Sequence, residues 1–210
     1  MPIVLNAKQL SSLAYSGKQV AYGVANGGIV YQIAPPPVSV PLVPAMTSAT
    51  TPAPFVVTSS TVWANSSQNY PHLSFDGTHN NSGWIGGNGS AAGTVPGGNS
   101  DANGYLNDWI KVYLGQPRTV TGMTLTGRTN GFLYQVAREF TLDGSFDDIT
   151  YFPIFTAHDG DVALATSNFQ TIFDRHDAWA VKCSYIRQTV TRIWQANTNV
   201  SGGKIQYYGY

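Results

Sequence analysis

The residues best suited to chemistry in this 210-residue chain lie in one short excursion, from Gly127 to Tyr134. Arg128 offers a guanidinium there, Asn130 an amide, and Phe132 and Tyr134 two aromatic rings. Sugars are recognised by this combination, because aromatic faces contact the C–H side of a pyranose while planar donors and acceptors bind its hydroxyls. The alternative is structural: an aromatic ring plugs the end of a β-sandwich while Arg128 pairs with a nearby carboxylate.

Two further aromatic residues, Trp63 and Tyr70, stand among Ser, Thr and Asn. A ring in such a polar stretch is expected to be more exposed than a core residue, so ligand contact and oligomer contact both stay open. Trp109 lies inside a strand-like stretch and is expected to be structural. Trp194 stands at a strand end and is left unassigned.

No catalytic constellation is visible. The four histidines are scattered without zinc-ligand spacing, and no Gly-x-Ser-x-Gly nucleophile turn occurs. Glu139 is the only glutamate, so a glycosidase pair would have to rest on aspartates. The only dense charged run, residues 174–177, is expected to be a solvated loop. We therefore predict that the protein is not an enzyme.

The single cysteine, Cys183, excludes an intrachain disulfide and a metal site built on cysteine pairs. Its flanks alternate like a strand, so a buried, inert thiol is expected. The segment Met1–Asn6 lacks a basic stretch followed by an apolar run, so no signal peptide is predicted. No apolar run approaches the ~18 residues of a membrane span, and membrane insertion is not expected.

The charged fraction is only 10%, well below the roughly 25% of an average soluble domain. Gly, Ser, Thr and Asn supply the polarity instead, as in β-rich extracellular or virion proteins. The formal net charge is zero and no basic cluster occurs, so neither nucleic acid nor an anionic membrane is an expected partner.

Two stretches about thirty residues apart define the elements that must position the excursion. Residues 108–115 alternate with period two, placing Ile110, Val112 and Leu114 on one face. Residues 137–151 alternate likewise and enter an Asp-Gly-Ser-x-Asp-Asp turn, which predicts a hairpin. From residue 45 onward no helix is predicted, and frequent turns indicate an all-β sandwich or barrel.

The amino-terminal part is predicted to be separate. Residues 1–34 hold a ten-residue repeat, indicating a small β-meander with too little core to be stable alone. We expect it to form a homo-oligomer or to anchor on a host structure; a monomeric appendage is the alternative. It resembles the small amino-terminal repeats of bacteriophage tail and tip proteins. Residues 35–44 are proline-rich and predicted to be an extended linker, leaving 45–210 as the main domain.

Residues 45–210 resemble the discoidin family, the coagulation-factor C-type domains of galactose-binding-like fold. Tyr70–Thr78 followed by Trp84 is similar to the family's Phe-Asp-Gly…Thr…Trp segment. Asp108–Gly115 is similar to its Trp-Ile-x-Val-Asp-Leu-Gly strand, and Ile205–Gly209 to its closing strand. The resemblance implies a discoidin-like, jelly-roll β-sandwich with Trp84 in its core.

The resemblance also implies where a ligand and a metal would bind. Ligands of the family meet three loops at one end of the sandwich, which by order are residues 49–71, 78–107 and 128–136. Many relatives hold a structural calcium near the Asp-Gly segment, helped by an acidic residue of the last strand. Lys204 stands at that position here, and a lysine repels a cation. We therefore expect no cofactor, with calcium disfavoured and Asp76 acting as a turn residue.

Together these features predict a bacteriophage virion protein of the tail-tip, fibre or spike type. Its sandwich would bind a host-surface glycan for host attachment, and residues 1–34 would contact other virion proteins. It would be made in the host cytoplasm and reside in the virion. One alternative is a structural connector or decoration protein whose sandwich loops bind neighbouring subunits. A carbohydrate-binding module of a larger enzyme is ranked lower, because no catalytic pattern accompanies the domain.

Overall fold

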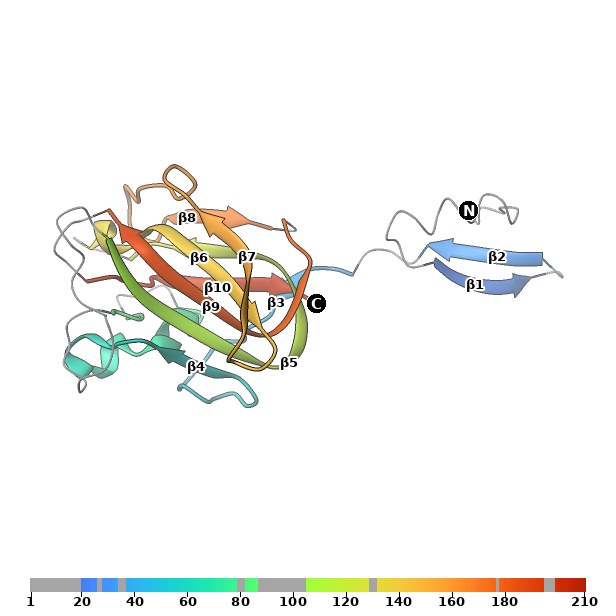
Figure 1. Ribbon diagram of the computed structural model, residues 1–210, viewed down its shortest axis with the longest axis horizontal. Coiled ribbons are helices and arrows are strands. Elements are labelled where there is room, and N and C mark those ends of the chain that lie inside the picture. The colour runs from blue at the N-terminus through green and yellow to red at the C-terminus, as the bar shows by residue number, and fades with distance from the viewer. Residues whose placement is uncertain are drawn as a thin grey trace. The chain divides into compact units, whose positions relative to one another are not determined.

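The protein is described by a computed structural model that covers residues 20–25, 28–33, 37–78, 82–86, 105–128, 132–176, 178–194 and 199–210. The chain divides into two compact units, Met1–Val38 and Ser39–Tyr210 (Figure 1). Within the described ranges, no helix is long and apolar enough to cross a membrane.

The first unit contains an antiparallel hairpin. Strand β1 (Val20–Ala25) pairs with β2 (Gly28–Ile33), from Val20 opposite Ile33 to Ala25 opposite Gly28. The predicted meander is thus seen as two strands, and its first nineteen residues lie outside the described ranges. An isolated two-stranded ribbon is only marginally stable in water. We therefore still expect residues 1–34 to gain stability from copies of themselves or from a structure on which they anchor.

The second unit is all-β, as predicted. Its sheet has the order β3-β10-β5-β9-β6-β7, with β4 and β8 pairing to β5, and all pairings are antiparallel. The strands are β3 (Val40–Pro41), β4 (Val56–Ser59), β5 (Tyr105–Thr126), β6 (Ala137–Ser145), β7 (Tyr151–Ala157), β8 (Thr171–Arg175), β9 (Val181–Ile193) and β10 (Lys204–Gly209). Four short 3-10 helices complete the described elements: η2 (Trp63–Asn65), η3 (Ser67–Asn69), η4 (Pro71–Phe75) and η5 (Leu133–Gln135).

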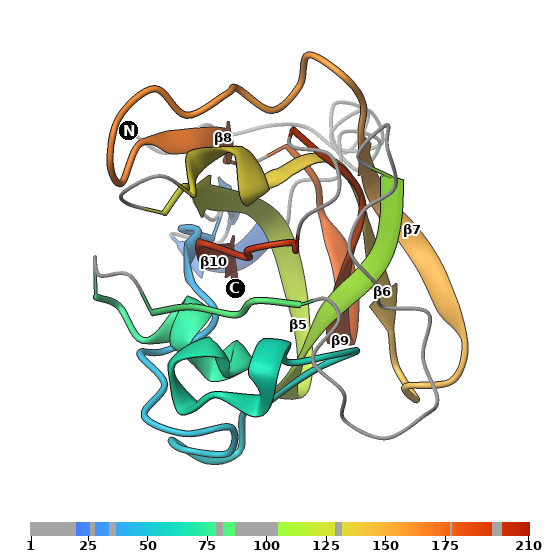
Figure 2. The ribbon, with the colours of Figure 1, turned by 90° about the vertical axis from the view of Figure 1, so that its left-hand side faces the viewer.

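Strand β5 connects the two layers of the sandwich. Its first part pairs with β4 and β9, whereas its last part pairs with β10 and β8 (Figures 1 and 2). It turns at Gly115, whose φ is +80° and where a Cβ atom would lie 2.2 Å from Cγ of Pro54. Glycine is required there, because other residues disfavour this conformation and no space exists for a side chain.

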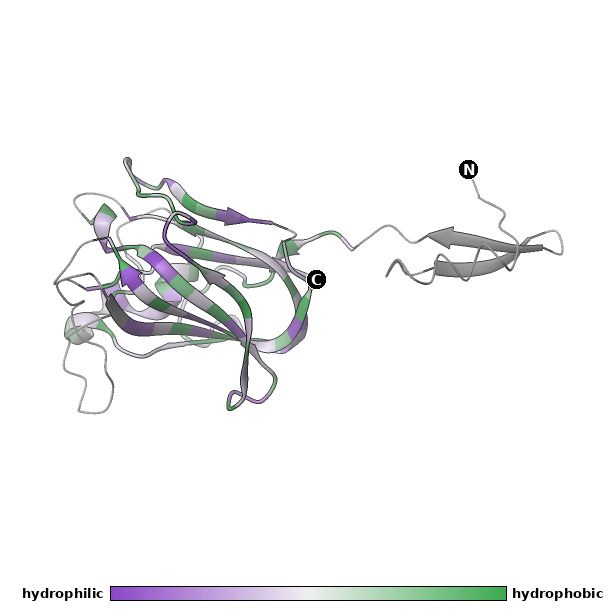
Figure 3. Ribbon diagram, turned by 45° about the horizontal axis from the view of Figure 1, so that its top comes forward, coloured by the Kyte–Doolittle hydropathy of each residue, from purple (hydrophilic) through white to green (hydrophobic). Residues whose placement is uncertain are grey.

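The core lies between the layers. Ile110, Val112 and Leu114 are each at most 1% exposed, which confirms the face predicted for this strand. Along the strands apolar and polar residues alternate (Figure 3), as a half-buried sheet requires. Trp84 is fully buried, and so is Cys183, whose pKa burial raises to about 12.

The linker is shorter than predicted. The boundary between the units falls after Val38, and residues 39–44, which we assigned to the linker, belong to the sandwich. There β3 pairs with the end of β10, and Leu42 donates its N–H to the Tyr207 carbonyl at 2.8 Å. Leu42 and Val43 are 8% and 2% exposed, so this segment contributes to the core.

Two turn predictions are corrected. The hairpin of β6 and β7 exists, but its turn is residues 146–150, because Asp143 and Gly144 are still paired to β7. Asp147 stabilises the turn by accepting the N–H groups of Ile149 and Thr150. Half of the charged run 174–177 is not a loop but the end of β8, which pairs with β5.

Candidate functional site

Four segments meet at one end of the sandwich: η2–η4, residues 82–86, η5, and the segment before β10 (Figure 2). A series of backbone contacts connects them. Trp63 donates its N–H to the Ile85 carbonyl at 2.8 Å, Ile85 pairs with Ser201 in an isolated β-bridge, and Ser201 donates to the Gln135 carbonyl at 2.8 Å. We call this assembly the loop end. Its backbone is braced across four segments that are distant in sequence.

Four aromatic side chains that the sequence singled out are exposed in these segments. Tyr134 is 49% exposed, Phe132 45%, Trp63 43% and Tyr70 36%. Their rings do not fill the end of the sandwich, as the structural alternative supposed. Each of these rings is thus accessible to a molecule that meets the loop end.

Arg128 has a different place from the one predicted. It is 8% exposed, and its guanidinium carbon lies 4.9 Å from the centre of the Phe132 ring. Burial lowers the pKa of the guanidinium, which nevertheless stays charged at neutral pH. Arg128 therefore lies on the buried side of the exposed Phe132 ring and holds it in place through a cation–π contact. Asn130, predicted beside it, lies outside the described residues.

Tyr70 precedes the helix η4 and lies near His72, with ring centres 6.1 Å apart. Burial lowers the pKa of His72, which keeps this imidazole neutral at neutral pH. Trp63 belongs to η2, two turns of 3-10 helix earlier in the chain. Both aromatics are thus carried by one compact helical segment.

The first predicted loop, residues 49–71, is not one loop. Strand β4 divides it, pairing with β5 from Val56 opposite Tyr113 to Ser59 opposite Ile110. Pro54 consequently packs at Gly115, at the opposite end of the sandwich from the start of β5. The residues before β4 and those after it lie at opposite ends of this strand, which is four residues long. Only the residues after β4 therefore reach the loop end.

A buried carboxylate, which the sequence analysis did not single out, anchors the start of that segment. Asp108 is fully buried, and its Oδ1 accepts hydrogen bonds from the Ser60 hydroxyl at 2.6 Å and the Thr61 hydroxyl at 2.8 Å. Its Oδ2 has no hydrogen-bond partner in the described part of the chain. Burial raises the pKa of Asp108, and the two hydroxyls oppose that effect. The available signal was an aspartate at the start of the alternating, largely apolar stretch 108–115.

An ammonium group ties three parts of the loop end together. The Nζ atom of Lys204 donates to the Leu73 carbonyl at 2.6 Å, the Ser82 carbonyl at 2.8 Å and Oδ1 of Asp76 at 2.9 Å. Asp76 also accepts the N–H of Thr78, as the turn prediction expected. Burial lowers the pKa of Lys204, and the Asp76 carboxylate counteracts this effect. We call the Lys204 ammonium together with its three acceptors, the carbonyls of Leu73 and Ser82 and the Asp76 carboxylate, the ammonium cage.

The residues of the ammonium cage do not fit a calcium ion. Calcium needs six to eight oxygen ligands, and the oxygens gathered here already surround a positive charge. Nor do the described residues contain a group of three or more His, Cys, Asp or Glu that could hold a metal. The loop end thus presents exposed aromatic rings on segments that backbone hydrogen bonds connect.

Comparison with known proteins agrees with this architecture. The family model of the F5/8 type C domain matches residues 56–203. Among solved structures, the chain is similar to chitosan-binding module 1 of a chitosanase/glucanase from Paenibacillus sp. IK-5 (19% identity, TM-score 0.52, covering 80% of this chain and 98% of that one). It is also similar to CBM32-3 of a family 31 glycoside hydrolase from Clostridium perfringens (17%, 0.50, 73% and 88%).

A third similar structure is the family 32 carbohydrate-binding module of Clostridium perfringens NanJ in complex with galactose (14% identity, TM-score 0.50, covering 73% of this chain and 93% of that one). At these identities the structural likenesses show the fold. A search of curated proteins gave no match. The family model covers more than half of the chain and its span coincides with the sandwich, so the chain belongs to the F5/8 type C domain family, as its sequence predicted.

Proposed function

We propose that the Ser39–Tyr210 unit binds carbohydrate at its loop end. The observation that carries this proposal is the set of exposed rings, Trp63, Tyr70, Phe132 and Tyr134, on a framework braced by backbone hydrogen bonds. Such rings can stack on the apolar faces of sugars without ordering long side chains, so little conformational entropy is lost on binding.

Similar structures support the ligand class. One is described as chitosan-binding and another was solved with galactose bound. The same fold hosts many functions, so the argument rests on the site itself. In this proposal Phe132 and Tyr134 contact the sugar, and Arg128 acts through Phe132. Asn130 remains a predicted contact of the same loop.

A glycan array probed with the whole chain tests the proposal. We expect Phe132→Ala and Tyr134→Ala each to weaken binding of the best glycan about five- to thirtyfold, since a truncated ring contact costs about 1–2 kcal/mol. Phe146→Ala is the matched control, because Phe146 is 54% exposed and lies in the β6–β7 turn, at the other end of β6 from η5. Equal losses in all three variants, or none in the first two, would refute the assigned site.

We further propose a virion setting, in which this glycan lies on a host surface. What supports it is the sequence: the low charge, and the repeat of residues 1–34 with its likeness to phage tail and tip proteins. A marginal hairpin such as β1–β2 gains stability by assembling with copies of itself. Light scattering of the whole chain and of residues 39–210 tests the assembly. An oligomer that becomes monomeric on truncation is expected, and two monomers would contradict it.

Electron microscopy of virions with a labelled antibody tests the setting, and labelling of the tail apparatus is expected. A reconstruction that showed the loop end buried against other virion proteins would favour the connector function instead.

A further inference from the structure

A second polar surface lies on the outer face of the smaller layer, which is formed by β3, β10, β8 and the last part of β5. Along β10, the side chains of Lys204, Gln206 and Tyr208 point outward, while those between them are buried. On the neighbouring β5, Thr126 stands opposite Lys204, and Thr124 opposite Gln206. The antiparallel register therefore places five polar side chains side by side on one face.

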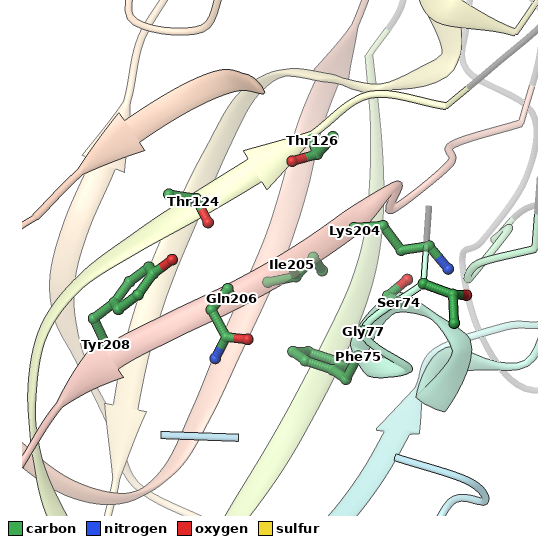
Figure 4. Close-up of a pocket in the computed structure, with 10 residues that line it drawn as sticks. Ser74, Phe75, Gly77, Thr124, Thr126, Lys204, Ile205, Gln206 and Tyr208 are labelled. Carbon is green, nitrogen blue, oxygen red and sulfur yellow. The ribbon is translucent and has the colours of Figure 1, made fainter. Parts of the chain in front are cut away.

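These residues border a hollow of about 260 Å³ (Figure 4). Its second wall comes from η4 and the turn that follows, so it is formed by segments far apart in the chain. The lining consists mainly of hydroxyl and amide side chains: Ser74, Phe75, Gly77, Thr78, Thr124, Thr126, Lys204, Ile205, Gln206 and Tyr208. Its volume is below the roughly 300–1,000 Å³ of pockets for drug-sized ligands, which suits a smaller molecule.

Several polar atoms of this face are available to a ligand. The hydroxyls of Thr124, Thr126 and Tyr208 line the hollow and make no hydrogen bond to another described residue. Gln206 donates its amide N–H groups to the carbonyls of Val43 at 3.3 Å and Tyr207 at 3.0 Å, which fixes the side chain and leaves its oxygen as an acceptor. Three donor–acceptor hydroxyls and an oriented amide oxygen match a polyhydroxylated molecule.

The aromatic part of the site is also fixed. The ring of Tyr208 packs on that of His176, with centres 4.0 Å apart, and Nε2 of His176 lies 3.0 Å from Oδ1 of Asp174. Asp174 stands opposite Thr124 across the β5–β8 pairing. The charged run that resembled a solvated loop in the sequence thus supports one edge of the hollow, and the remaining surface of the Tyr208 ring lines it.

The charge balance narrows the ligand class. Among the described residues, Lys204 is the only charged one that lines the hollow, and the Asp76 carboxylate at 2.9 Å compensates it. A phosphate or carboxylate would meet no uncompensated cation, and an apolar ligand would leave the hydroxyls unsatisfied. We propose that this hollow is a second carbohydrate site, which binds one neutral pyranose unit independently of the loop end. Its ligand class rests on the proposed function.

Threonine methyl groups report on this site directly. The whole chain, labelled at threonine methyls, is titrated with four neutral sugars, galactose, N-acetylgalactosamine, N-acetylglucosamine and mannose, in turn and followed by NMR. We expect saturable shifts of the Thr124 and Thr126 signals with at least one sugar. Thr124→Val, read at Thr126, and Thr126→Val, read at Thr124, should each weaken binding about fivefold, the equivalent of one neutral hydrogen bond. Thr189→Val, on the outer face of the larger layer, should change nothing.

Tyr134→Ala separates this proposal from the proposed function. If that variant leaves the Thr124 and Thr126 shifts intact while the valine variants weaken them, the second site stands. Sugar binding that Tyr134→Ala abolishes and neither valine variant alters would overturn the second site and leave the loop end in place. Binding of none of the four sugars at Thr124 and Thr126 would also overturn it, and loss of array binding as well would overturn both.

Discussion

Replacing Lys204 by methionine removes the ammonium cage and keeps most of the side-chain volume. Lys204 and Asp76 are both only 12% exposed as side chains, so the variant leaves a nearly buried carboxylate and two carbonyls without their donor. Removing one partner of a buried ion pair costs about 3–5 kcal/mol. Since both side chains keep some contact with water, the lower end applies, and we expect a loss of about 3 kcal/mol.

Thermal unfolding measures this loss. In a unit the size of Ser39–Tyr210, each kcal/mol corresponds to about 2–4 °C, so Tm should fall by about 6–12 °C. Lys182→Met is the matched control, because Lys182 is exposed on β9 and has no ion pair with a described residue. Its effect should stay within about 0.5 kcal/mol. A Lys204→Met variant as stable as this control would refute the structural role of the cage.

A charge reversal tests the reasoning about calcium. Lys204→Glu would place a second carboxylate beside Asp76, near the carbonyls of Leu73 and Ser82. Without metal this variant should be less stable than Lys204→Met, because like charges repel. Added calcium should raise its Tm, since a ligand that binds only the folded state stabilises it. The Tm of the native chain should be the same in calcium and in a chelator.

Three further predictions follow from buried groups and from the bend of β5. The raised pKa of Asp108 means that the folded state holds its proton more tightly, so this contribution to stability is complete below the unfolded pKa of about 3.8 and is lost as pH rises through the folded value. In urea unfolding, Asp108→Asn should therefore gain stability relative to the native chain between pH 3 and pH 7, and a constant difference would contradict this. Gly115→Ala should lower the free energy of unfolding by about 2 kcal/mol or more, because its φ is +80° and Pro54 fills the space; a stability equal to that of the native chain would show that the bend relaxes. Cys183 should react with a thiol reagent at neutral pH only after unfolding, since it is buried and has a pKa of about 12; rapid labelling of the folded protein would contradict its place in the core.

The sequence was sufficient for the fold where the signal is local. Period-two alternation identified the buried face of Ile110, Val112 and Leu114, and turn residues located the β6–β7 hairpin to within a few positions. Motif order then identified the family. These features depend on neighbours a few residues apart, which is what alternation and turn chemistry record.

It was insufficient where a residue's environment is made by distant segments. The prolines around Val40 predicted a linker, yet Val40 and Pro41 pair with Gly209 and Tyr208 near the carboxyl terminus. The residues of the first loop do not reveal that β4 divides it. Arg128 looked like a ligand residue because its type suits sugars, but its burial under Phe132 results from packing at the end of the sandwich.

Lys204 links the two proposed sites. Its ammonium holds the segments that carry η4 and residues 82–86 in the loop end, while its own chain lines the hollow on the outer face. Replacing Lys204 should therefore disturb both sites, although Lys204 itself contacts no sugar at the loop end. A loss of glycan binding in Lys204→Met would consequently not show which residues contact the sugar. Thr124→Val and Tyr134→Ala are informative because each changes one site and leaves the ammonium cage intact. If the two sites are independent, the effects of these two substitutions on the free energy of glycan binding must add, since Thr124 lines only the hollow and Tyr134 lies only in the loop end.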